Sequence, residues 1–545
     1  MIKIVLSSFL VTALYTPFGI YFEKGKTSTS FSLQLIYGLI VISFFALLFN
    51  FFFSLNQIFN TVFLVVGLAL LIKHRKIYLN KNYFVFCLIS SLLIFLLITN
   101  SHVYRPDAGL YHLPYISILN HEKIILGISN LHFRFGHISI VQYLSAVSNN
   151  LVFGINGIVF PVALIGVAVI VNFLANIYLK FLRNEFDFHF LFIFSIMVFI
   201  FYKMNRYSEY GNDAPAHFLL FLLVSELIKN FRNIQKDNIS NYFLIAMFIV
   251  MNKIILITSI IFPLIYFLKG KFTFKYISKK NFFISFFVFL WIAKNILTSG
   301  CALYPLKVTC VNNLKWTNLE KAEKVSIENE AWAKGWPDFR KKEIDIKQKD
   351  YSKKFYWLNT WLQNHFIIIL KILTPYILLL ILFSVLIEKE KKYIQEKIFI
   401  KVLIALSFVG LVIWFIKVPA FRYGYSYIII LIALLFASYG RKFIFHKTSK
   451  SIFKITIAIL LTIFTFKNLN RILLNNDIYF NYPWPRFYSY EKNNNITKNK
   501  FQIINGKKIY EPSERYCMFS NAPCGPNNKL KIMKSNNYLI FLPSF

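Results

Sequence analysis

The sequence predicts an all-α polytopic membrane protein, and three observations indicate it. Of the 545 residues, 57% are hydrophobic and 62 are Phe, and the mean hydropathy is +0.54. Apolar runs of roughly 17 to 25 residues recur along the chain, which is the length a helix needs to cross the hydrocarbon core. Basic residues cluster in short loops between these runs.

We expect about 12 to 14 transmembrane helices from this pattern. The first run begins almost at Met1 and has no small-x-small cleavage site, so we expect an uncleaved first helix rather than a signal peptide. The apolar runs lie near 4–22, 31–54, 57–73, 83–99, 150–178, 188–202, 214–229, 241–252, 254–268, 281–299, 363–387, 398–417, 425–440 and 451–466.

The basic residues predict the orientation of the chain. The formal net charge is +37, and short loops rich in Lys and Arg are typical of the cytoplasmic side, where they also meet anionic lipid. This distribution favours topology over nucleic-acid binding, so no nucleic-acid partner is expected. The basic loops are 73–76, 180–183, 229–236, 269–280 and 441–450.

These loops divide the chain into a transmembrane domain, 1–466, and a small external C-terminal segment, 467–545. Two external loops interrupt the first part, a catalytic-type loop at 100–149 and a partly helical lid at 300–362. The parity of the crossings requires a break at Asn252–Lys253, where a charged residue interrupts an apolar run.

Cysteine placement supports this topology. Four of the five cysteines lie in segments expected outside, as the pairs Cys301 with Cys310 and Cys517 with Cys524. Close pairs on one side favour disulfides in an oxidising compartment such as the bacterial periplasm. A zinc site is the alternative, although neither pair has the spacing of a C-x2-C knuckle.

Charged residues gather at helix ends that the topology places outside. They are Asp107, Glu209, Asp213, Lys253 and Arg422, and Lys294 lies inside the expected span at 281–299. Structural roles compete with functional ones here, because an aspartate can cap a helix and a long basic side chain can extend to the membrane surface. A lysine inside an apolar run more often marks a partner or a pathway.

Together these residue types suggest chemistry on a phosphorylated lipid. An acid can deprotonate a hydroxyl, or hold a divalent cation such as Mg²⁺ or Mn²⁺, and Asp107 is the candidate ligand. Lysine and arginine can bind a phosphate leaving group. The histidines, among them His112 and His132, lack metal-ligand spacing, so a histidine metal centre is not expected.

The segment Tyr104-Arg105-Pro106-Asp107 in the first large external loop resembles the acidic motif of the GT-C integral-membrane glycosyltransferases. In that comparison the stretches 110–118 and 139–147 look like amphipathic surface helices. One difference is that the loop follows the fourth expected span rather than the first. The chain also resembles a group of uncharacterised bacterial multispanning proteins, through Asp107-x-x-x-Tyr111-His112, 127–136, 299–305 and 517–524.

The resemblance implies a glycosyltransferase that moves a sugar from a polyprenyl-phosphate donor in the membrane lipid to a periplasmic glycan, lipid or protein. Asp107 would be the base or metal ligand, with Glu209 or Asp213 as a second acid. Lys253 and Arg422 would bind the donor phosphate, and His112, His132 and Arg134 would line the substrate pocket. The protein would lie in the bacterial inner membrane with its active side in the periplasm. A transporter or flippase of lipid-linked glycans, or an O-antigen polymerase-like or ligase-like enzyme, is the alternative.

Overall fold

The computed structural model describes most of the chain. The described residues are 1–23, 29–101, 107–204, 210–211, 213–231, 236–265, 279–336, 347–353, 355–386, 389–391, 398–440, 443–445, 447–474, 484–485, 500–512, 516–520, 523–526 and 530–543.

Each predicted apolar run contains helix among the described residues, which confirms the all-α membrane fold. The helices up to the central break are α1 (Ile2–Tyr15), α2 (Ile20–Glu23), α3 (Phe31–Asn50), α4 (Gln57–Lys73), α5 (Arg75–Tyr78), α6 (Lys81–Ile98), α7 (Leu113–His121), α8 (Ile140–Ser148), α9 (Phe160–Leu182), α10 (Phe188–Lys203), α11 (Asp213–Asn230) and α12 (Lys236–Asn252). The later ones are α13 (Ile261–Leu264), α14 (Lys279–Ser299), α15 (Leu319–Ala333), α16 (Gln348–Tyr351), α17 (Leu358–Trp361), α18 (Ile367–Leu386), α19 (Ile398–Lys417), α20 (Phe421–Gly440) and α21 (Lys447–Leu473).

Shorter elements connect the helices. The helical turns are η1 (Thr16–Gly19), η2 (Ala108–His112), η3 (Ile128–Asn130), η4 (Phe133–Gly136), η5 (Gly154–Val159), η6 (Ile254–Ile260), η8 (Lys307–Thr309) and η9 (Leu362–Phe366). Three two-stranded antiparallel sheets pair β1 (Lys389–Lys391) with β2 (Phe443–Phe445), β3 (Lys500–Ile504) with β4 (Lys507–Glu511), and β5 (Lys531–Ser535) with β6 (Tyr538–Leu542).

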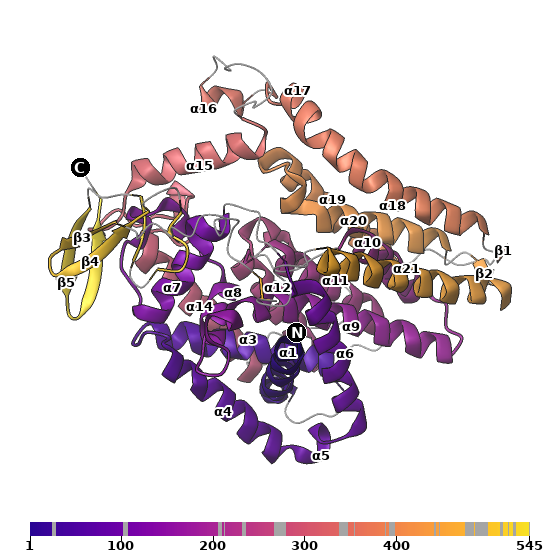
Figure 1. The fold of residues 1–545 in the computed structure, drawn as a ribbon. Coiled ribbons are helices and arrows are strands. Elements are labelled where there is room, and N and C mark those ends of the chain that lie inside the picture. Colours follow the sequence, from indigo (N-terminus) through magenta and orange to yellow (C-terminus); the bar gives the residue numbers. More distant parts are fainter. Residues whose placement is uncertain are drawn as a thin grey trace.

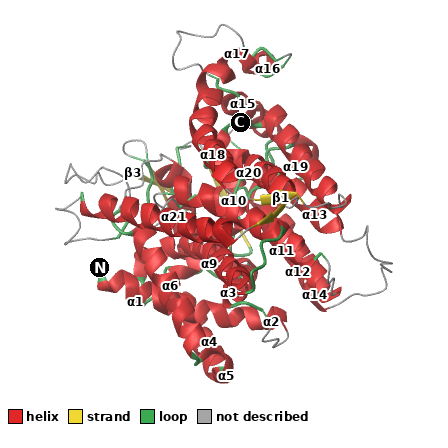
Figure 2. Ribbon diagram, turned by 90° about the vertical axis from the view of Figure 1, so that its right-hand side faces the viewer, coloured by secondary structure: helices red, strands yellow, loops and turns green. Residues whose placement is uncertain are grey.

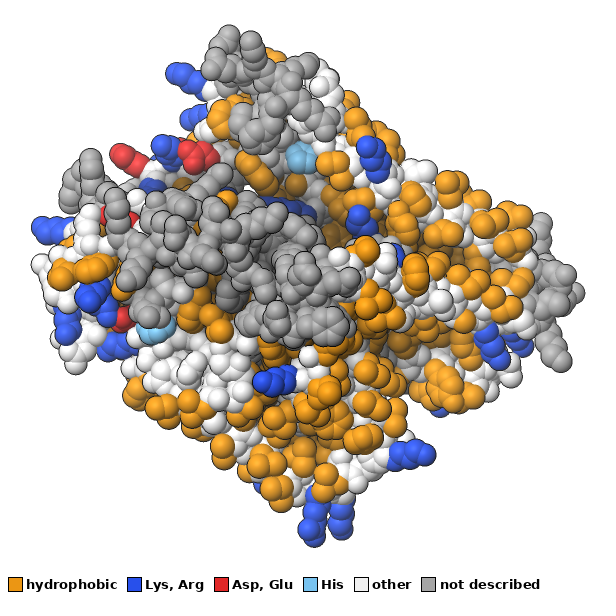
Figure 3. All heavy atoms as spheres, in the orientation of Figure 1, with side chains coloured by type: hydrophobic (Ala, Val, Ile, Leu, Met, Phe, Trp, Pro, Cys, Tyr) orange, Lys and Arg blue, Asp and Glu red, His pale blue; other side chains and the backbone are white. Residues whose placement is uncertain are grey.

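In the described part of the chain, nine helical segments are long and apolar enough to cross a membrane, and four shorter apolar helices accompany them. Hydrophobic side chains cover the surface over α4 and over α18 to α21, whereas charged side chains gather near α15 and the C-terminal strands (Figure 3). Two views place α4 and α5 at the opposite end of the molecule from α16 and α17 (Figures 1 and 2).

Polar residues at the apolar boundaries start many of these helices. Side-chain oxygens of Ser30, Asn56, Asn80 and Asp187 accept hydrogen bonds from first-turn amides of α3, α4, α6 and α10. Ser139 and Gln142 form a complete capping box at α8. The cap at Ser139 matters most, because Ser139 is buried and a buried helix end has no water to satisfy its amides.

The predicted break at Asn252–Lys253 is confirmed. Lys253 has an extended backbone between α12 and η6, and the Ser259 hydroxyl donates to the Ala246 carbonyl, 3.3 Å away. The chain therefore reverses direction at Lys253 and returns alongside α12, which puts the lysine at the tip of a helical hairpin.

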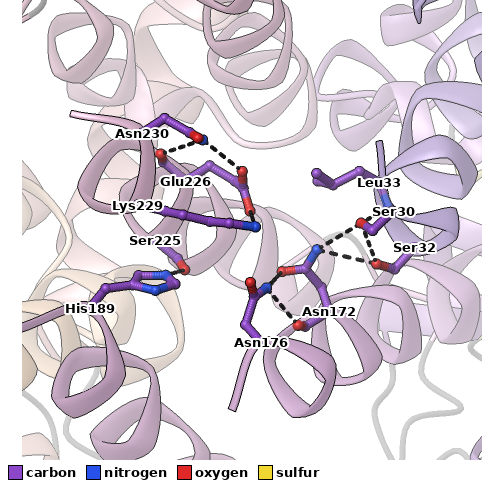
Figure 4. A network of polar contacts seen from close by, with 10 residues as sticks. All are labelled: Ser30, Ser32, Leu33, Asn172, Asn176, His189, Ser225, Glu226, Lys229 and Asn230. Carbon is purple, nitrogen blue, oxygen red and sulfur yellow. Dashed lines mark hydrogen bonds and ion pairs between the residues drawn. The ribbon is translucent and has the colours of Figure 1, made fainter. Parts of the chain in front are cut away.

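A second polar region, which we call the inter-helix network, joins α3, α9, α10 and α11 (Figure 4). Asn172 Nδ2 donates to Ser30 Oγ (3.3 Å) and Ser32 Oγ (3.2 Å), and its Oδ1 accepts from Asn176. The other members are His189 with Ser225, and Glu226 with Lys229 and Asn230.

The C-terminal segment is a β structure that packs on the 107–136 segment. The expected hairpin around Asn505–Gly506 is confirmed as β3–β4, and β5–β6 was not predicted. Leu126 pairs with Ile540, and Met518 N donates to Gly109 O at 3.0 Å. Both cysteine pairs are disulfides, Cys301–Cys310 and Cys517–Cys524, which removes the zinc alternative.

One expectation is wrong. The stretches 110–118 and 139–147 were expected to be amphipathic helices on the membrane surface. Every residue of α8 is buried, and α7 is buried from Leu113 to Asn120. These helices pack between α3, α9 and the C-terminal segment, where their apolar faces meet protein rather than lipid.

Candidate functional site

A cavity of about 660 Å³ lies between α10, α11, α18 and α20, and η2 closes one side of it. Four of the predicted residues line it: Asp107, His112, Asp213 and Arg422. They come from positions far apart in the chain, so only the fold brings them together. The lining also has an extensive apolar part, formed by Val162, Phe199, Ile200, Phe218, Phe221, Ile368, Ile372 and Phe421.

Asp107 faces two arginines rather than its own helix. It precedes η2 without making a side-chain capping hydrogen bond, so the capping role considered from the sequence does not apply. Arg422 Nη1 donates to its Oδ2 at 3.2 Å, and Arg134 Nη1 lies 3.8 Å from its Oδ1. The carboxylate is 19% exposed, which leaves it accessible from the cavity.

Asp213 and Lys253 form a second ion pair at the same end of the cavity. Asp213 begins α11, and Lys253 reaches it from the tip of the α12–η6 hairpin. The ammonium group also lies 4.1 Å from the centre of the Tyr423 ring. The two ion pairs are linked, because Tyr423 accepts a 2.7 Å hydrogen bond from Arg422 Nη2.

Arg422 is held by aromatic rings and keeps one donor free. Its guanidinium lies 4.8 Å from the Tyr423 ring centre and 5.0 Å from that of Trp332. Its Nε is buried and has no hydrogen-bond partner among the described residues. A buried N–H without an acceptor costs free energy.

His112 is buried beside Asp107 and 2.8 Å from Gln142 Nε2 through its Nδ1. Burial lowers the pKa of His112 to about 4. The ring is therefore neutral near pH 7. Its Nδ1 contacts Gln142 of α8, and the residue lines the cavity.

Three further cavity residues escaped prediction: Lys203, Trp332 and His365. His365 Nε2 is buried without a hydrogen-bond partner in the described part of the chain. The available signal was its place at the start of the apolar run 363–387, where a histidine is unusual. Trp332 belongs to the segment 300–362, which was expected to be an external loop, and its contact with the cavity could not be inferred from the sequence.

The remaining predicted residues lie around this centre. Arg134 and Lys253 do not line the cavity and reach it through Asp107 and Asp213. His132 does not line the cavity either. Its Nδ1 accepts a hydrogen bond from the Arg134 amide at 3.1 Å, and its ring packs on Phe133 and Phe135. Glu209 lies outside the described residues.

The donor set fits an anion better than a cation. Two carboxylates, Asp107 and Asp213, are accompanied by three cationic groups, Arg134, Lys253 and Arg422. The described residues include no group of three His, Cys, Asp or Glu side chains suited to a metal. The charged neighbours of Asp107 are both arginines, Arg134 and Arg422, which disfavours a divalent cation at this carboxylate.

No curated protein and no solved structure matches the chain. One family model, described as a domain of unknown function (DUF8201), matches residues 1–429. The matched region contains the whole cavity, from Asp107 to Tyr425, and stops before the C-terminal strands. The chain belongs to the DUF8201 family.

Proposed function

We propose that this protein is a GT-C-type membrane glycosyltransferase that moves a sugar from a polyprenyl-phosphate donor to a periplasmic acceptor of the cell envelope. The observation that carries the proposal is a single cavity with a charged end and a long apolar wall. A lipid phosphate has a matching charged group and a long apolar chain. An enzyme that draws its donor from the bilayer needs a pocket that accepts both.

The phosphate would bind at Arg422. Arg422 and Lys203 both line the cavity and supply positive charge there, and arginine is suited to phosphate because its donors form a planar fork. His365 Nε2 supplies another polar atom without a partner among the described residues. The isoprenoid chain would lie along the apolar residues of α10, α11 and α18.

Asp107 would act as the general base. The acceptor hydroxyl oxygen attacks the anomeric carbon as its proton passes to Asp107. The bond from that carbon to the phosphate oxygen breaks, and its electron pair leaves with the phosphate. Arg422 contacts Asp107 before the donor binds, so an incoming phosphate would compete for the guanidinium and leave the carboxylate freer to accept a proton.

A binding measurement separates this proposal from its alternatives. Purified protein in nanodiscs is titrated with a polyprenyl phosphate and with the corresponding polyprenol, and thermal stabilisation is recorded. We expect saturable stabilisation by the phosphate alone, and at least about 10-fold weaker binding in R422Q. The exposed Arg183, at the end of α9, provides the matched control R183Q.

Transfer is then measured with a sugar-charged polyprenyl phosphate and envelope membranes as acceptor. Release of polyprenyl phosphate together with labelled acceptor supports the glycosyltransferase. Movement of the charged lipid across a proteoliposome membrane without cleavage would instead indicate a flippase. Equal stabilisation by polyprenol and polyprenyl phosphate would contradict the phosphate site.

A further inference from the structure

A second cavity lies apart from the candidate site, between η1, α2, α3, α4 and α14. It has a volume of about 570 Å³. Its walls are almost entirely aromatic or aliphatic, and two lysines at the start of α14, Lys279 and Lys280, form its polar part. The apolar lining consists of Phe18, Tyr21, Phe22, Val41, Phe45, Phe49, Phe59, Val62, Phe63, Val66 and Phe283.

This cavity opens on a lipid-facing surface. On α4, Val62 is 50% exposed and its neighbours Ile58 and Val65 are more exposed still. Residues of this kind on a membrane-spanning protein contact acyl chains. An apolar groove on such a surface is therefore filled by lipid, and its polar end determines which lipid is preferred.

The polar end is built from buried groups. Lys280 Nζ donates to Asn241 Oδ1 at 2.9 Å, and Asn241 Nδ2 donates to Glu23 Oε1 at 2.8 Å. Asn241 and Glu23 are both buried. This chain fixes the Lys280 ammonium at the groove, while Lys279 beside it is exposed. Among the described residues of this hydrogen-bonded chain and Lys279, two lysines and one carboxylate leave a net positive charge.

The length of the groove indicates which kind of lipid tail it can hold. Along α3 it extends from Val41 to Phe49, which is about 12 Å at 1.5 Å per residue. Half of a hydrocarbon core is about 15 Å deep, so the groove suits an acyl chain of one leaflet. A polyprenyl chain is several times longer than this groove.

We infer that the cavity at Lys279 and Lys280 binds one anionic glycerophospholipid, with the headgroup phosphate at the lysines and an acyl chain between α3 and α4. This site is separate from the 660 Å³ cavity, and its occupancy does not depend on the proposed transferase activity. The lipid would fill the space between α4 and α14.

Native mass spectrometry of the full-length protein, titrated with phosphatidylglycerol or phosphatidylcholine, tests the inference. We expect one phosphatidylglycerol to be retained in preference to phosphatidylcholine. K279Q should weaken that binding about 5-fold, as expected for one lysine near a membrane surface, and K279Q/K280Q more than 10-fold. R75Q/K76Q removes two exposed charges from α5, away from the cavity, and should leave binding unchanged.

A second variant tests the tail independently of charge. V62W places a bulky ring in the groove and should displace the lipid while both lysines remain. Because K280Q breaks the contact with Asn241, K279Q alone decides the charge requirement if the double variant fails to fold. Equal retention of both lipids, equal loss in R75Q/K76Q, or wild-type binding in K279Q would overturn the inference. So would preferential binding of polyprenyl phosphate at this site.

Discussion

The molecule contains two buried polar regions that differ in what they leave unsatisfied. Around the 660 Å³ cavity, residues more than 300 positions apart meet, since Asp107 and Arg422 are separated by 315 residues. The inter-helix network instead closes mostly on itself, and Asn172 alone contacts Ser30, Ser32 and Asn176 (Figure 4).

The two regions also differ in their charged residues. The cavity region holds two acids and three bases in a chain of ion pairs. The network has one acid, Glu226, with Lys229 at 4.0 Å. His189 Nδ1 and Glu226 Oε1 lack hydrogen bonds among the described residues, but neither residue lines either cavity described here.

In a membrane domain, the position of the polar atoms that lack hydrogen bonds separates a structural role from a ligand-binding role. Helices that pass through lipid need internal hydrogen bonds to pack, and the network provides them. Arg422 and His365 line the 660 Å³ cavity, and Arg422 Nε and His365 Nε2 have no hydrogen-bond partner among the described residues. We therefore expect substitutions in the two regions to separate activity from stability.

The largest effect is expected at Asp107. D107N keeps the size of the side chain but removes the base, and general bases typically contribute 100-fold or more to rate. Transfer from a sugar-charged polyprenyl phosphate should fall at least about 100-fold while the melting temperature changes little. The control is D350N, in the exposed Asp350–Lys353 pair. Full transfer activity in D107N would remove this residue from the mechanism.

The second-largest effect is expected at low pH, which should destabilise the folded region around the 660 Å³ cavity. Burial lowers the pKa of His112 to about 4 and that of His132 to about 3, so the folded protein favours the neutral rings. The unfolded chain takes up these protons near pH 6.5. Stability is therefore fully present above pH 6.5 and falls as the pH drops toward 4, by about 3 kcal/mol for His112 alone.

Thermal unfolding at several pH values measures this effect. The melting temperature of the wild type should fall between pH 6.5 and pH 4, and H112Q should show a smaller fall. The exposed His121 of the same segment provides the control H121Q, which should behave like the wild type. A pH profile unchanged by H112Q would show that His112 does not carry the acid sensitivity.

Much of the helical fold was predictable, because the requirement for long apolar runs is strong and local. Even the reversal at Lys253 followed from one charge in an apolar run and the parity of the basic loops. The prediction of a membrane-surface helix at α8 was wrong, because an amphipathic pattern does not reveal whether the polar face meets lipid headgroups or other helices.

The site was predictable only in part, for a related reason. A charge at a helix mouth is visible in the sequence, as with Asp107 and Arg422, but its partners depend on tertiary packing. His132 looked equivalent to His112, yet only His112 lines the cavity, whereas the His132 ring packs on Phe133 and Phe135. His365 and Trp332 went unnoticed because their approach to the cavity depends on how α15 and η9 pack against α20.

A smaller effect is expected at His365, which tests whether the cavity and the inter-helix network have different roles. H365F keeps a ring but removes Nε2, and should weaken polyprenyl phosphate binding about 10-fold, the effect of one hydrogen bond to a charged group. H189F is the matched variant in the network, where His189 Nε2 lies 2.9 Å from Ser225 Oγ. H189F should lower the melting temperature and leave binding intact. Reversed outcomes for the two variants would contradict the division between the regions.

The smallest effect is expected at Asn172. N172A removes the contacts to Ser30, Ser32 and Asn176, and interhelical hydrogen bonds in membrane proteins contribute about 1 kcal/mol or less each. The free energy of unfolding should fall by about 1 kcal/mol, measured by denaturant titration in detergent, and polyprenyl phosphate affinity should not change. N313A, at an exposed asparagine, is the control. If N172A instead weakened binding without loss of stability, the network would be coupled to the cavity. Packing along α9 to Val162, which lines that cavity, would then be the connection to examine.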